Sequence, residues 1–110
     1  MKGEELVHNS QGYVSGQDMT YTLSDDYDTL IIVFVYGHTG TGGTTIETTV
    51  NITSTSGTLT NISTVRVANT YVGGVTKTYI LTGAKKGAVI TFPGKSPRGY
   101  DHVTAYTIFC

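Results

Sequence analysis

The chain has 110 residues, with 38% apolar residues, 14% charged residues and a formal net charge of −1. A chain so close to neutral lacks the basic face that releases counterions from phosphate groups, so we expect no nucleic-acid partner. Its longest apolar run, residues 30–36, is too short to cross a bilayer, and its first residues lack the apolar core of a secretory signal. We therefore expect that the protein is made in a cytoplasm and does not insert into a membrane.

Threonine and 14 glycines fill much of the remaining composition. Threonine is branched at Cβ and favours strands over helices. The only cysteine is Cys110, so no disulfide within the chain is possible. The length is typical of one domain, and we predict a single domain over residues 1–110.

The first third of the chain alternates apolar and polar residues, which is typical of strands. Short strands are predicted over residues 6–8 and at 13–14, followed by a half-buried strand over 19–23. The acidic segment 24–28 predicts a turn, because aspartate side chains bond their own backbone there. Residues 29–36, TLIIVFVY, are apolar on both faces and predict a central strand.

The middle third begins with a glycine-rich segment, residues 37–45, for which we predict a loop. A strand follows over residues 46–52, with Ile46, Thr48, Val50 and Ile52 on one face. A turn is predicted over residues 53–57 and a weak edge strand over 59–62.

A glycine pair, Gly73 and Gly74, predicts a two-residue hairpin loop between two β-rich segments. In that register Val72 lies opposite Val75, and Arg66 lies opposite Leu81. We further predict a turn over residues 83–87, a strand over 88–92, an irregular loop over 93–101 and a closing strand over 102–109. The total is eight to ten strands and no helix, which predicts an all-β, antiparallel, jelly-roll-like β-sandwich.

No motif for catalysis or for a cofactor is present. The segment 37–43, GHTGTGG, lacks the lysine and the following helix of a phosphate-binding loop. Asp25, Asp26 and Asp28 leave a calcium site open as an alternative to a plain acidic turn. His8, His38 and His102 lack zinc-ligand spacing, although one histidine near a threefold axis would supply three ligands. We predict no catalytic residue, no cofactor and no metal, with a small hydrolase as a remote alternative.

Candidate interface residues come from the loops and from the closing strand. Tyrosines outside the strands offer broad contact area at low entropy cost, with local packing over a turn as the alternative. The closing strand is apolar, but the sequence leaves open which of its faces serves the core. The candidate interface residues are Tyr27, His38, Arg98, Tyr100, Val103 and Phe109.

Charge is distributed unevenly along the chain. Residues 1–36 contain six acids and one base, whereas residues 64–110 contain six bases and one acid. This polarity predicts either scattered solvated loops or complementary contacts between copies or between sheets. Exposed ion pairs stabilise little, so the first interpretation is favoured.

Two segments, 19–36 (MTYTLSDDYDTLIIVFVY) and 79–92 (YILTGAKKGAVITF), resemble the small Thr/Gly-rich β domains of bacteriophage virion proteins. These domains occur as fibre tips, head fibres and capsid decoration proteins, and such families are commonly trimeric. The resemblance implies a non-enzymatic structural or attachment component at the virion surface that acts by self-association and surface binding. Its partners would be copies of itself, other virion proteins or host surface glycans. The alternative is a carbohydrate- or peptide-binding module of a bacterial surface system.

Overall fold

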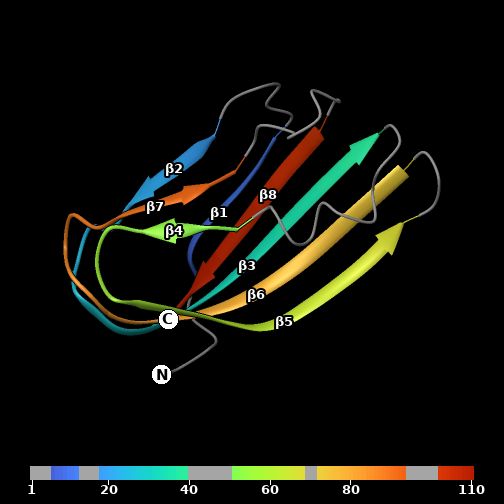
Figure 1. Ribbon diagram of the computed structural model, residues 1–110. Helices are drawn as coiled ribbons and strands as arrows, with labels where there is room; N and C mark the ends of the chain where they lie inside the picture. Colours follow the sequence, from blue (N-terminus) through green and yellow to red (C-terminus); the bar gives the residue numbers. More distant parts are fainter. Residues whose placement is uncertain (1–5, 13–17, 40–50, 69–71, 94–101) are drawn as a thin grey trace.

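The computed structural model describes residues 6–12, 18–39, 51–68, 72–93 and 102–110. These residues form eight strands and no helix, so the prediction of an all-β fold is confirmed (Figure 1). It follows that the described part of the chain has no helix with the length and apolar character needed to span a membrane. The strands are β1 (Leu6–Gly12), β2 (Met19–Thr22), β3 (Tyr27–Thr39), β4 (Thr53–Ser54), β5 (Thr58–Ala68), β6 (Val72–Ala84), β7 (Val89–Phe92) and β8 (His102–Phe109).

The strands form two antiparallel sheets that pack face to face. The larger sheet has the order β1-β8-β3-β6-β5, and the smaller has the order β2-β7-β4. The ladders β1·β8, β2·β7 and β3·β6 are nested, as in a jelly roll, where an eight-strand ribbon folds back on itself. The innermost pair differs, because β4 pairs with β7 while β5 joins the edge of the larger sheet beside β6. The jelly-roll-like prediction is confirmed with that one strand displaced.

Strand β3 is the central strand of the larger sheet, as its apolar sequence predicts. It pairs with β6 on one side and with β8 on the other. Its inward side chains, Leu30, Ile32, Phe34 and Tyr36, are all 0% exposed. The strand also continues through Gly37 to Thr39, so the loop predicted from residue 37 is wrong at its start. Backbone pairing to both neighbours extends the strand there, and residues 40–45 lie outside the described residues.

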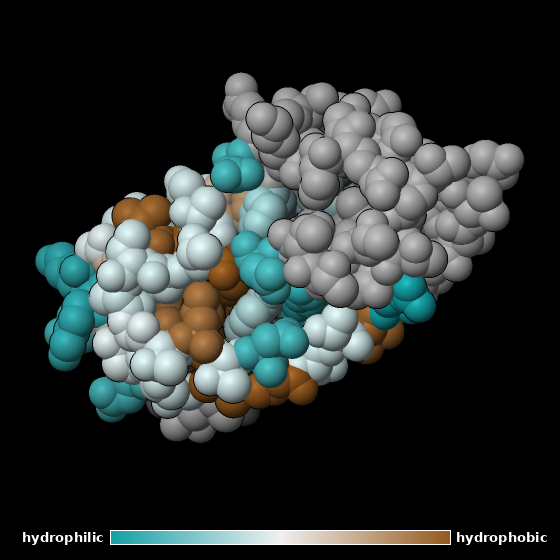
Figure 2. All heavy atoms as spheres, in the orientation of Figure 1, coloured by the Kyte–Doolittle hydropathy of each residue, from teal (hydrophilic) through white to brown (hydrophobic). Residues whose placement is uncertain are grey.

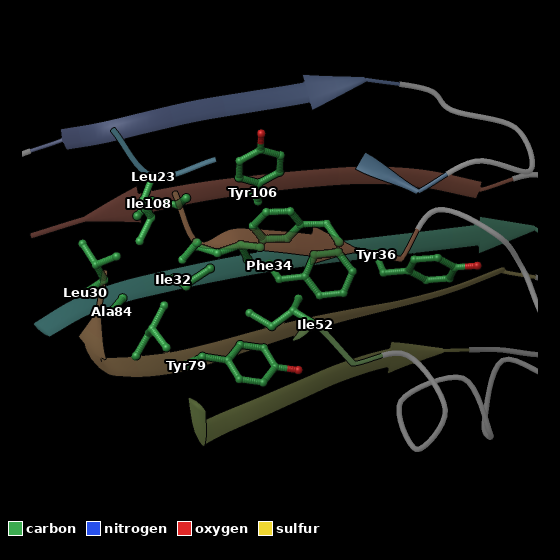
Figure 3. Close-up of a cluster of buried hydrophobic side chains, with 14 of the residues drawn as sticks. Leu23, Leu30, Ile32, Phe34, Tyr36, Ile52, Tyr79, Ala84, Tyr106 and Ile108 are labelled. Atoms are coloured by element: carbon green, nitrogen blue, oxygen red, sulfur yellow. The ribbon is translucent and has the colours of Figure 1, made fainter. Parts of the chain in front are cut away.

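The core lies between the two sheets and is rich in aromatic rings (Figure 3). Phe92 of β7 stacks on Tyr106 of β8 with ring centroids 3.8 Å apart, and Phe34 lies 5.9 Å from Phe92. Burying large side chains from both sheets in one cluster gives the dominant stabilising term in such a small domain. The cluster comprises Leu23, Leu30, Ile32, Phe34, Tyr36, Ile52, Val75, Tyr79, Leu81, Ala84, Ala88, Ile90, Phe92, Tyr106 and Ile108.

Three connections between the sheets, β2–β3, β4–β5 and β6–β7, lie together at one end of the molecule (Figure 1). The acidic segment begins the first of them, and the predicted turn is confirmed, although β3 already begins at Tyr27. The Asp26 carboxylate accepts a hydrogen bond of 2.7 Å from the backbone N–H of Lys86, which ties this turn to the predicted turn at the end of β6. Leu23 exchanges backbone hydrogen bonds with Gly87 and Ala88 beside it.

The hairpin between β5 and β6 differs from the prediction. Gly73 and Gly74 lie within β6, opposite Ala68 and Val67, so the two-residue loop predicted there is wrong. Arg66 pairs with Val75, and Leu59 pairs with Leu81. Leu81 is fully buried, and the observed register places an apolar neighbour beside it where the predicted register would place a charged arginine.

Strand β5 is also longer than the weak strand predicted over residues 59–62. It has eleven residues and contains a bulge between Asn61 and Ser63. The Asn61 side chain stabilises the bulge: its Nδ2 donates to the carbonyl oxygens of Ser63 and Thr78, at 3.0 and 3.1 Å. Its Oδ1 accepts a hydrogen bond from the Thr64 hydroxyl. The strand can therefore extend past the irregularity to Ala68.

Smaller differences concern the first and fourth strands. Strand β1 continues from the predicted residues 6–8 to Gly12, because the closing strand β8 pairs along its length. Strand β4 contains only Thr53 and Ser54, where the sequence predicts a turn. Ile52 is buried, as predicted, but it precedes that strand. Residues 13–14 and 46–50 of the predicted strands lie outside the described residues.

Candidate interaction surface

The larger sheet has one face that does not contribute to the core. Along β3, β6 and β8 the buried side chains alternate with residues that point to the opposite side of the sheet. In the ladders Ile31 lies between Ile80 and Phe109, Val33 between Thr78 and Thr107, and Val35 between Thr76 and Ala105. We call this grid of three residues from each of three strands the outer face.

The outer face is accessible, in contrast to the inward side chains of the same strands. Val35 is 41% exposed, and the other members are partly exposed. None of them belongs to the core cluster or to the partly buried residues that pack against it. The neighbouring edge strand extends the apolar character, because Val65, opposite Thr76, is 59% exposed.

The outer face contains no charged side chain. Its members are isoleucine, valine, phenylalanine, alanine and threonine, and most of them are branched at Cβ. Contiguous apolar surface of this kind commonly marks an interaction site. Figure 2 has the orientation of Figure 1, with the smaller sheet in front, so it shows the side of the molecule away from the outer face, where hydrophobic, pale and hydrophilic residues are interspersed.

Two polar groups of β6, Lys77 and Tyr79, point inward instead. Lys77 is only 4% exposed, and its Nζ donates a hydrogen bond of 2.9 Å to Asn51 Oδ1. Tyr79, also buried, follows two residues later on the same face. Burial raises the pKa of the Tyr79 phenol, and the nearby backbone of Ile52 offsets part of that rise. These groups are enclosed between the sheets, so they contribute no charge to the outer face.

The structure brings few of the predicted interface residues together. Phe109 lies on the outer face, next to Ile31. Tyr27 begins β3 opposite Ala84 and packs against the core, so its partly buried side chain serves local packing. In the β3–β8 ladder His38 lies opposite His102, and Val103 opposite Gly37, but their side chains are not described. Arg98 and Tyr100 lie outside the described residues.

The residues that sequence reasoning missed are those of the central strand. The sequence predicts that Ile31, Val33 and Val35 belong to a central strand, which is confirmed, but it does not predict that the described chain covers only one face of that strand. The available signal is the closing strand, whose alternation places Tyr106 and Ile108 in the core and places Ala105, Thr107 and Phe109 on the opposite face. The described residues contain no cluster of three histidine, cysteine, aspartate or glutamate side chains placed to bind a metal ion.

Comparison with known proteins identifies no relative: no family model, no curated protein and no solved structure matches the chain.

Proposed function

We propose that this protein is a non-enzymatic structural or attachment component of a bacteriophage virion surface, either a capsid decoration protein or a fibre-head protein. It acts by self-association and surface binding, and a trimer is the favoured assembly. The observation that carries the proposal is the outer face, an uncharged and largely apolar sheet surface that the described chain leaves uncovered. No catalytic residue or cofactor is assigned.

Two further observations support the proposal. The segments that resemble phage virion domains form β2, β7 and parts of β3 and β6, so they contribute strands to both sheets. Jelly-roll arrangements also recur in viral capsid domains, although a shared fold alone does not imply a shared function. On a particle that displays many copies, modest contacts at each copy add up through avidity.

The test is the mass of the purified protein in solution. Sedimentation equilibrium over a wide concentration range is expected to show a trimer that dissociates on dilution. A monomer at all concentrations would overturn the proposal. If that monomer bound sugars on a glycan array, the carbohydrate-binding module would become the better description.

A further inference from the structure

The outer face has its midpoint on the central strand of the larger sheet. Ile31, Val33 and Val35 project from β3, with β8 and β1 on one side and β6 and β5 on the other. We propose that the outer faces of three copies pack against one another around the threefold axis of the proposed trimer, with Val33 nearest that axis. This inference rests on the proposed function, because it specifies how self-association takes place.

The area of the outer face is sufficient for such a contact. The three strands of the grid, spaced about 4.8 Å apart and each presenting about 20 Å of length, cover roughly 300 Å² in projection, and the flanking strands β1 and β5 extend this surface to roughly 500 Å². The accessible area exceeds the projection because the side chains stand out from the sheet. The result approaches the roughly 600–800 Å² that each partner buries in small specific interfaces.

The chemistry of the outer face suits a second copy of the same chain. Since no member of the grid is charged, two copies do not bring like charges together. Identical sheets have the same twist, so each face presents the same shape to its neighbours around the axis. Thr78 and Thr107 flank Val33 in the two ladders, so polar residues are interspersed with the apolar ones on this face.

The edges of the larger sheet are less suited to association. Strand β1 has a bulge between Leu6 and His8, and β5 has the bulge between Asn61 and Ser63. A bulge interrupts the regular row of N–H and C=O groups that an added strand would need. Copies that cannot extend the sheet edge to edge still have the outer face available, so the assembly remains closed and finite.

The first experiment places a charge on the outer face of the full chain. Val35→Lys introduces an ammonium group at a position that is already 41% exposed, so the monomer can accommodate it. We expect association to weaken by about 100-fold or more, because the charges of facing copies would repel each other. The matched control is Thr20→Lys, at an exposed position on β2 of the smaller sheet. It adds the same charge, and we expect it to leave association unchanged.

A second experiment avoids the introduced charge. Val35→Cys, made together with Cys110→Ser, places a single thiol on the outer face. A water-soluble maleimide should label it about tenfold more slowly when the protein is concentrated enough to assemble, because thiol reactivity requires access. A Thr20→Cys variant in the same background should be labelled at the same rate at every concentration.

The outcomes separate this inference from the proposed function. An assembled wild type, a dissociated Val35→Lys variant and a protected Val35→Cys thiol would support both. If the wild type assembles while Val35→Lys assembles equally well or the Val35→Cys thiol stays reactive, the face-to-face contact is overturned and self-association by another surface remains. A monomeric wild type would overturn the proposed function itself.

Discussion

The rings of Phe92 and Tyr106 stack with their centroids 3.8 Å apart and their planes inclined by 7°. Phe92 belongs to the smaller sheet and Tyr106 to the larger, so this contact joins the two layers. Tyr106 also lies 5.6 Å from His8, and Phe92 lies 5.9 Å from Phe34, which extends the aromatic contacts across the core. These ring contacts therefore form part of the packing between the three-stranded sheet and the larger one.

Truncating Phe92 tests that dependence. Because its ring is fully buried, Phe92→Ala should lower the free energy of unfolding by about 3–5 kcal/mol, through lost burial and the cavity left behind. The control is Thr20→Ala on the exposed side of β2, for which we expect a loss of about 0.5 kcal/mol. Urea denaturation measures both. A loss below about 1 kcal/mol for Phe92→Ala would contradict the assignment of this ring to the centre of the core.

Substitution of Gly57 tests how closely the β4–β5 connection approaches the backbone of β6. Its φ is +80°, and a Cβ there would lie 2.6 Å from the carbonyl oxygen of Thr82. Gly83 has a similar φ of +67°, but a Cβ added to it would meet no atom within 4 Å. Both alanine variants incur backbone strain of about 1 kcal/mol or more, but only Gly57→Ala adds a clash with backbone. Gly57→Ala should therefore lower the midpoint of thermal unfolding more than Gly83→Ala, and equal losses would contradict the close approach.

Because the Tyr79 phenol is buried, we expect the folded protein to lose stability at alkaline pH. Its hydroxyl is enclosed and makes no hydrogen bond of regular geometry to the described residues, and burial raises the pKa of the phenol. The folded state thus favours the protonated phenol. The stability that depends on the protonated Tyr79 phenol is fully present below the unfolded pKa of about 10. It is lost as the pH rises through the folded pKa.

Urea denaturation at about pH 8 and about pH 11 measures this effect. We expect Tyr79→Phe to lose less stability between the two values than the wild type does, because phenylalanine does not ionise. Equal losses for the wild type and Tyr79→Phe would show that burial of this phenol does not contribute.

The parts of the fold that local patterning determines could be predicted from the sequence. The apolar residues of β3 indicate a central strand, and the alternation of Tyr21 with exposed threonines indicates a half-buried one. The register of β5 against β6 could not be predicted, because glycines permit a turn without requiring one. Burial of Leu81 beside Leu59 depends on contacts distant in sequence.

Only one residue of the candidate surface could be predicted. Phe109 follows from its place on the apolar closing strand, whereas the pattern around Ile31, Val33 and Val35 predicts a central strand and no interface. Residues apolar on both faces indicate that both faces avoid water, but the sequence does not say whether the cover comes from the same chain. Among the described residues the two-sheet arrangement covers only the inward side of β3, and we propose other copies of the chain as the cover of its outward side.

Association through the outer face and association between oppositely charged segments should respond differently to salt. The outer face has no charged member, so association through it should change little between about 0.05 and about 1 M sodium chloride. Sulfate, which strengthens the burial of apolar surface, should favour the assembled form. If copies instead met through the acidic first third and the basic second half of the chain, salt would screen the attraction and assembly would weaken steeply. Sedimentation velocity at several salt concentrations distinguishes the two modes, and steep weakening in sodium chloride would assign the contact to the charged segments.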